Sequence, residues 1–190
     1  TVEQVIDTIN NNTNIGKNVK YNIGKALIEY VSHDKNVSLD NFHSNFQRLN
    51  LINKSYLNHV DTYKYNPVNG EIIINEEYVN SNDTNVDNVY MQIVLDMIYS
   101  NGKKVGFESD NLKALNKGFR ETMAKQIVGD EHKENFDSDE YVYTQLIGRI
   151  IGVDILMDAF KTNNSQSVEN TLINYGLKSI NELAEYNISR

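Results

Sequence analysis

The segment Asn88–Ser100 constrains the fold more than any other part of the chain, because it is long enough for a helix and apolar on most of its sides. Its large apolar residues are Val89, Met91, Ile93, Val94, Leu95, Met97 and Ile98. A helix that is apolar all round is usually buried at the centre of a domain. No apolar run in the chain approaches the roughly 18–20 residues that a membrane span needs. The sequence therefore predicts a domain built round this helix, with no membrane span.

Helical spacing of apolar residues recurs before and after this central segment. In Val19–Val31, for example, Val19, Ile23, Leu27 and Tyr30 fall on one helical face. Gly152 is a suitable residue to follow a helix end. The other predicted helices are Val2–Ile9, Leu39–Leu49, Leu112–Val128, Tyr141–Ile151, Asp154–Phe160, Val168–Tyr175 and Ser179–Tyr186.

The hydrophobic period changes near residue 60. Val60–Tyr65 alternates loosely, and Glu71–Asn75 is a short β-branched run. The residues between them, Asn66–Gly70, include a proline that presets a turn and an Asn-Gly pair that tolerates positive φ. This arrangement predicts a β-hairpin. The expected fold class is therefore α+β and mainly helical, with one small antiparallel sheet, and 190 residues are enough for one buried core.

Charge and composition exclude several function classes. A formal charge of −8, with no cluster of Lys and Arg among aromatic residues, disfavours nucleic acid and anionic membrane surfaces as partners. The absence of Cys removes disulfides and thiolate nucleophiles. His33, His43, His59 and His132 are scattered, and we expect the acidic run around His132 to be a solvated loop rather than a cation site. No serine-nucleophile motif or glycine-rich phosphate loop is present.

Three motifs in the middle of the chain carry a family resemblance. Gln92–Ser100 resembles the HExLHxxxS helix of zinc metallopeptidases, and Gly106-Phe107 matches a Gly-Phe pair that commonly follows it. Leu115–Glu121 resembles their LNEGxTE run, and Tyr141–Asp154 resembles the helical lobe that comes next. The layout of Tyr63–Ala124 is thus similar to that of the gluzincin group.

The resemblance implies a single zincin-like domain over residues 1–190, with a central buried helix beneath the sheet. Its N-terminal helices would occupy residues 1–59, the sheet and active-site helices 60–128, and a C-terminal helical lobe 129–190.

Every position that would bind zinc is replaced. The resemblance aligns Gln92 and Asp96 with the two His ligands, Ile93 with the general-base Glu, and Lys117 with the third ligand. Zinc peptidases need three ligands and a base, and these four residues cannot supply them. We therefore expect no cofactor, no metal and no enzyme activity. The part of the motif that remains is Ser100, Gly106, Phe107, Asn116, Gly118 and Glu121.

The replaced positions suggest a new contact between the two helices. Asp96 and Lys117 could form a buried ion pair where a metal would bridge them. Alternatively, both side chains point into a solvent-filled cleft, or Lys117 pairs with Glu121 one turn away on its own helix.

The resemblance also suggests a binding function. In zincin-like folds the edge strand above the active-site helix pairs with an extended peptide, so Ile72, Ile73 and Ile74 would border a groove for a protein or peptide partner. The alternative is a plain hairpin strand packed on the helix. The leading expectation is a catalytically inactive peptidase-like protein that binds a peptide through the former active-site cleft.

A second expectation is a structural or assembly domain of a larger exported bacterial protein, with no ligand. An extracellular or cell-surface location in a low-GC Gram-positive bacterium fits the resemblance and the Asn-rich composition, and a chain that begins at Thr1 suggests a trimmed gene product. A hydrolase with rebuilt chemistry would need a nucleophile or metal set that the sequence does not offer. The sequence gives no indication of oligomeric state.

Overall fold

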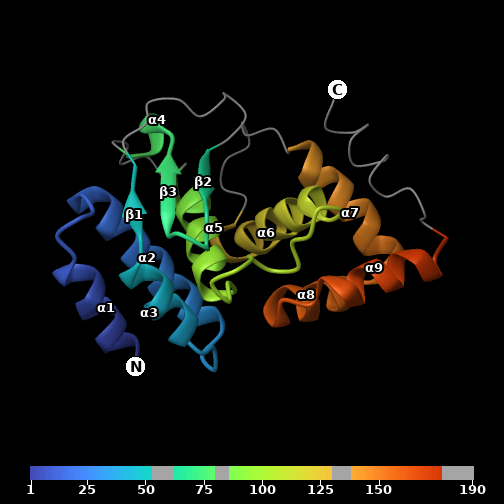
Figure 1. Cartoon of the computed structure of the whole chain (residues 1–190), viewed down its shortest axis with the longest axis horizontal. Helices are drawn as coiled ribbons and strands as arrows, with labels where there is room; N and C mark the ends of the chain where they lie inside the picture. The colour runs from blue at the N-terminus through green and yellow to red at the C-terminus, as the bar shows by residue number, and fades with distance from the viewer. Residues whose placement is uncertain (53–61, 80–85, 130–137, 177–190) are drawn as a thin grey trace.

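The computed structural model describes residues 1–52, 62–79, 86–129 and 138–176, and there the chain is mainly helical with a small three-stranded sheet (Figure 1). The elements are α1 (Val2–Asn11), α2 (Lys17–His33), α3 (Asp40–Gln47), β1 (Asn50–Leu51), β2 (Tyr63–Tyr65), β3 (Glu71–Ile74), α4 (Glu76–Val79), α5 (Val86–Ile98), α6 (Lys113–Val128), α7 (Asp139–Ile151), α8 (Val153–Thr162) and α9 (Ser165–Asn174). The predicted mainly helical α+β class is confirmed. Helix ends differ from the predicted ones by three residues at most, and the predicted helix Ser179–Tyr186 lies outside the described residues.

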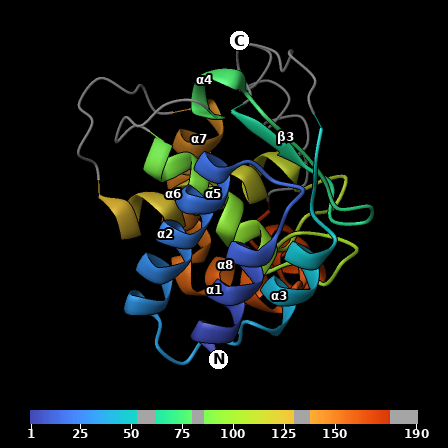
Figure 2. The ribbon, with the colours of Figure 1, turned by 90° about the vertical axis from the view of Figure 1, so that its left-hand side faces the viewer.

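Helix α5 is the centre of the molecule, as its apolar run predicts. It contacts α2 and α3 on one side and α6 on the other, and strand β2 also packs on it (Figures 1 and 2). Ile93, Val94, Leu95 and Met97 are all completely buried. None of the helices in the described part of the chain combines the length and the apolar character required to cross a membrane.

The predicted hairpin is present as β2 and β3, with Tyr63 opposite Ile74 and Tyr65 opposite Ile72. Gly70 closes the turn with a φ of +74°, and a Cβ there would lie 2.1 Å from the carbonyl oxygen of Arg48, so only glycine fits. The turn is further held by the side chain of Asn66, whose Oδ1 accepts from the backbone N–H of Val68.

The expectation of an antiparallel sheet is wrong, because β1 joins the hairpin in parallel and makes the sheet mixed. The chain leaves α3 at the buried Leu49 and runs beside β3, where the N–H of Asn50 donates to the carbonyl of Gly70 at 2.8 Å. A two-residue strand has no periodicity to reveal it in the sequence. The strand order β1-β3-β2 also makes Glu71–Ile74 the central strand, so the expectation of an edge strand at Ile72, Ile73 and Ile74 is wrong too.

Residues in and near the segment Leu115–Glu121 hold α6 against its neighbours. The side chain of Asn116 donates to the carbonyl of Val105 and accepts from the N–H of Phe107, which anchors the turn between α5 and α6. Gly118 lets α7 approach closely, since a Cβ there would lie 2.1 Å from the carbonyl oxygen of Glu140. An aromatic cluster, with ring centroids 5.8–6.0 Å apart, joins α6 to α8: Phe107, Phe119 and Phe160. These residues therefore have structural roles.

Candidate functional site

A cleft of about 700 Å³ lies between the hairpin and α6. Its walls are β2 with the following turn, the loop from Lys103 to Asp110, and one face of α6 that presents Lys113, Asn116, Lys117 and Arg120. These α6 positions follow the three- and four-residue spacing that places side chains on one helical face. The volume falls within the range of about 300–1,000 Å³ found for ligand pockets.

The floor of the cleft is a hydrogen-bonded cluster of Asp96, Arg120 and Tyr63. Nη1 of Arg120 lies 3.2 Å and 3.0 Å from Oδ1 and Oδ2 of Asp96, and the Tyr63 hydroxyl donates to Oδ2 at 2.7 Å. The guanidinium carbon of Arg120 lies 5.0 Å from the centroid of the Tyr63 ring. The Asp96 side chain is 2% exposed and that of Arg120 is 15% exposed, so the ion pair is buried beneath the cleft and open to it only at Arg120.

Gln92 extends this cluster along α5. It lies one helical turn before Asp96, and its Oε1 accepts from Nε of Arg120 at 3.3 Å. Its amide nitrogen donates to Oδ1 of Asn88 at 2.6 Å. Arg120 therefore binds both side chains that the resemblance aligns with the two His ligands.

The pKa values of the cluster follow from burial and from mutual attraction. Burial raises the pKa of the Asp96 carboxyl, and the Arg120 guanidinium and the Tyr63 hydroxyl act against that rise. Burial alone would lower the pKa of Arg120, but the Asp96 carboxylate beside it gives a net increase. Burial also raises the pKa of Tyr63 well above its ordinary value, so its hydroxyl stays a proton donor. The geometry is that of an ion pair, with Nη1 of Arg120 within 3.2 Å of both carboxylate oxygens of Asp96.

Of the alternatives that the sequence left open, the pair between Asp96 and Lys117 is not formed. Lys117 instead pairs with Glu140 on α7, with Nζ 3.2 Å from Oε1. Glu121 pairs with Lys125, one turn further along α6, and accepts from the hydroxyl of Ser138. It therefore does not form the alternative pair with Lys117. Arg120 and Glu121 lie on different sides of α6. Arg120 faces α5 and can reach Asp96, whereas Glu121 faces the start of α7 and bonds to Ser138.

The structure brings together only some of the predicted site residues. Asp96 and Lys117 line the cleft, and Gln92 reaches it through Arg120. Ile93 is completely buried in the core, and Glu121 lies outside the cleft lining. Arg120 and Tyr63 were not predicted. A signal for Arg120 exists in the sequence, because a carboxylate in an apolar helix needs a cation and arginine suits buried ion pairs better than lysine.

Strand β2 is the edge of the described sheet, and its outer side borders the cleft. The N–H of Asn66 donates to the carbonyl of Glu71, and that of Asn75 to the carbonyl of Thr62, so these are hydrogen-bonded pairs of the ladder. Such pairs alternate along an antiparallel ladder. Lys64 therefore bonds to β3, whereas the backbone N–H and C=O groups of Tyr63 and Tyr65 point outward. None of the other described strands pairs with this outer edge.

Within the described ranges, no three side chains of His, Cys, Asp or Glu are placed to hold a metal ion together. His59 and His132 lie outside those ranges. Asp96, the most deeply buried carboxylate of the cleft, is already bound to a cation and to a hydroxyl.

No family model matches this chain, and no curated protein or solved structure is significantly similar to it.

Proposed function

We propose that the protein is a non-catalytic, peptidase-like binding module that takes an extended peptide into the cleft along β2. One observation carries the proposal: the outward backbone groups of Tyr63 and Tyr65 border a cleft of about 700 Å³. A peptide that adds a strand to a sheet edge gains main-chain hydrogen bonds, and adjacent pockets select its side chains. The docking strand in this proposal is β2, in place of the Ile72–Ile74 segment expected from the sequence.

The chemistry of the cleft floor supports binding without catalysis. The guanidinium of Arg120 binds Gln92 and Asp96, the two positions that the resemblance aligns with zinc ligands. A fixed cation there repels a metal ion electrostatically and saturates the carboxylate that could bind it. Ile93, aligned with the general base, cannot accept a proton.

Metal content tests the non-catalytic part of this proposal. We expect mass spectrometry of the purified protein to find no stoichiometric zinc. Added zinc should also leave the melting temperature unchanged, since only a ligand that binds the folded state raises the melting temperature. Stoichiometric zinc, or a zinc-dependent rise in melting temperature, would overturn the proposal of an inactive site.

Substitutions at Tyr65 test the docking strand. Peptides selected from a random library on the wild-type protein should bind Tyr65→Ala measurably and Tyr65→Pro at least about tenfold more weakly. Both variants lose the ring, but only proline removes the outward N–H, and it does so without breaking a ladder bond to β3. Equal binding by the two variants would argue against strand addition.

A structural or assembly role remains a second candidate, because α7 and the start of α8 carry an exposed apolar stripe. Val142, Leu146, Ile150 and Val153 are each about half exposed, at 48%, 53%, 47% and 46%. Apolar stripes of this kind often mark protein contacts. Sedimentation of the wild type and of Leu146→Glu tests this role, since association that the variant abolishes would favour it over peptide binding.

A further inference from the structure

We infer that the segment bound along β2 is acidic, with carboxylates spaced along an extended backbone. This inference rests on the proposed peptide-binding function and adds the chemistry of the partner. It comes from the charge pattern of the cleft, which is opposite in sign to that of the whole chain.

The cleft concentrates the positive charge of an acidic protein. Six cationic and four anionic side chains line it, a balance of +2 in a chain with a formal charge of −8. The cations are Lys64, Lys103, Lys104, Lys113, Lys117 and Arg120, and the anions are Glu71, Asp96, Glu108 and Asp110. A cleft focuses the field of the charges that line it, so an anionic ligand is attracted there although the net charge of the protein would repel it.

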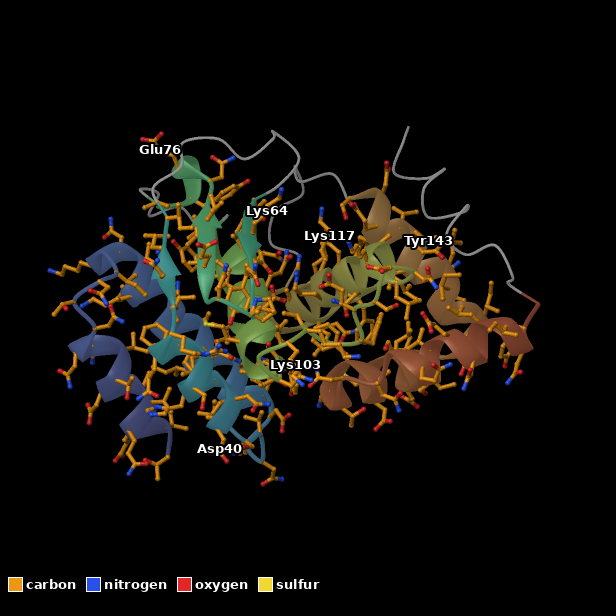
Figure 3. All side chains as sticks on the ribbon, viewed as in Figure 1. Asp40, Lys64, Glu76, Lys103, Lys117 and Tyr143 are labelled. Atoms are coloured by element: carbon orange, nitrogen blue, oxygen red, sulfur yellow. The ribbon has the colours of Figure 1, made fainter. Side chains whose placement is uncertain are left out.

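Several of these cations are available to a ligand. Lys64, Lys103 and Lys113 are exposed, and each has no ion-pair partner among the described residues. They come from β2, from the turn after α5 and from the first turn of α6, so they border the cleft on different sides; Figure 3 labels Lys64, Lys103 and Lys117 there. Lys104 and Lys117 already contact Ser165 and Glu140 respectively.

Arg120 adds a donor at the floor. Its Nε and Nη1 are bonded to Gln92 and Asp96, whereas Nη2 has no hydrogen-bond partner in the described part of the chain. Since this side chain is 15% exposed and lines the cleft, Nη2 can donate to a carboxylate that enters from above. A charge-assisted bond of this kind is stronger than a neutral one.

The edge of β2 favours an acidic peptide over a nucleic acid. A peptide backbone can both donate to and accept from the outward groups of Tyr63 and Tyr65, whereas a sugar–phosphate backbone has no N–H to donate. In an extended peptide, side chains on one face are about 6.6–6.8 Å apart. Glutamates on the face of the peptide that turns towards the cleft floor would lie near Arg120 and Lys113. A peptide with alternating glutamates therefore fits better than nucleic acid.

The test compares three capped, fluorescent peptides of about seven residues that alternate Val with Glu, Gln or Lys. We expect anisotropy titrations to show the Glu peptide binding about tenfold or more tightly than the Gln peptide, with the Lys peptide weakest. Binding of the Glu peptide should weaken as salt rises from about 0.05 to 0.5 M, because screening reduces charge attraction.

A matched pair of variants tests whether the preference for the Glu peptide depends on the cleft charges. Lys113→Glu reverses a cleft charge at the first residue of α6, and Lys17→Glu makes the same change at the first residue of α2, outside the cleft lining. A glutamate at a helix N-terminus is favourable, so both variants should fold. We expect Lys113→Glu to lower the affinity for the Glu peptide about tenfold and Lys17→Glu to change that affinity less than twofold.

The outcomes separate the two proposals. Equal affinity for the Glu and Gln peptides, or equal effects of the two charge reversals, would overturn the acidic preference and leave peptide binding intact. Failure of all three peptides to bind would overturn both proposals. Displacement of the Glu peptide by a single-stranded oligonucleotide of equal affinity would overturn the choice of a peptide partner.

Discussion

Two ion pairs on the same helix, formed by residues three positions apart, differ in what surrounds them. Arg120 pairs with Asp96 beneath the cleft, with exposed fractions of 15% and 2%. Lys117 pairs with Glu140 on α7, with exposed fractions of 33% and 10%. Loss of Arg120 leaves Asp96 as an unpaired charge away from water, whereas loss of the Glu140 carboxylate leaves Lys117, which is one third exposed and which water can solvate. The Arg120–Asp96 pair should therefore contribute much to the stability of the fold at the cleft floor, and the Lys117–Glu140 pair should contribute little.

The largest effect is expected from Arg120→Met, which keeps an unbranched side chain of similar length and leaves Asp96 as an unpaired buried charge. The free energy of unfolding should fall by about 3–5 kcal/mol, measured by urea denaturation. The matched control is the double variant Asp96→Asn/Arg120→Met, which removes both charges and should recover most of the loss. If Arg120→Met lowered the free energy of unfolding by less than about 1 kcal/mol, the Arg120–Asp96 pair would not be what stabilises the cleft floor.

The same variant should respond to pH in a defined direction. Arg120 lowers the pKa of Asp96 against the effect of burial, so its removal leaves burial to raise that pKa further. Below the raised pKa Asp96 is neutral, and the penalty for burying its charge disappears. The stability difference from wild type should therefore be greatest near pH 7 and shrink as the pH falls towards about 5. A difference that grows on acidification would contradict this explanation.

A smaller effect is expected from Tyr63→Phe, which removes the hydroxyl that donates to Asp96 at 2.7 Å. Loss of a hydrogen bond to a charged group should cost about 1.5–3 kcal/mol in the free energy of unfolding. Tyr65→Phe is the matched control on the same strand, because the Tyr65 hydroxyl is buried with no hydrogen-bond partner among the described residues. That substitution should be neutral or slightly stabilising, and equal losses from the two would show that Asp96 does not depend on Tyr63.

The smallest effect is expected from Glu140→Gln, which removes the carboxylate charge and leaves the partly exposed Lys117. Since the lysine side chain is one third exposed, its pair with Glu140 should contribute less than about 1 kcal/mol, and salt should reduce that contribution. Thermal unfolding at low and high salt measures both. A loss as large as that of Arg120→Met would remove the distinction between the two pairs.

The sequence predicted those features that depend on local pattern. The apolar run in α5 identified the central helix, and the Asn66–Gly70 turn identified the hairpin. Strand β1 could not be predicted, because two residues carry no period, and its pairing made β3 central and β2 the edge.

The partner of Asp96 depended on how α6 is rotated against α5. Lys117 and Arg120 both lie on the cleft face, and sequence spacing alone cannot decide which of them reaches α5. The aromatic cluster of Phe107, Phe119 and Phe160 and the close approach at Gly118 fix that rotation through contacts distant in sequence. The metallopeptidase resemblance predicted a contact between α5 and α6, the two helices that the Asp96–Arg120 pair joins. The relation of the chain to that family stays a prediction.

Amide hydrogen exchange of β2, followed by NMR with and without the alternating Glu peptide, tests the central claim most directly. Bound peptide should protect the outward amides of Tyr63 and Tyr65 and leave the amide of Lys64, already bonded to β3, little changed. Protection of Tyr63 and Tyr65 alone would be the result predicted for strand addition at the cleft. Saturating peptide with no change at either tyrosine amide would contradict it.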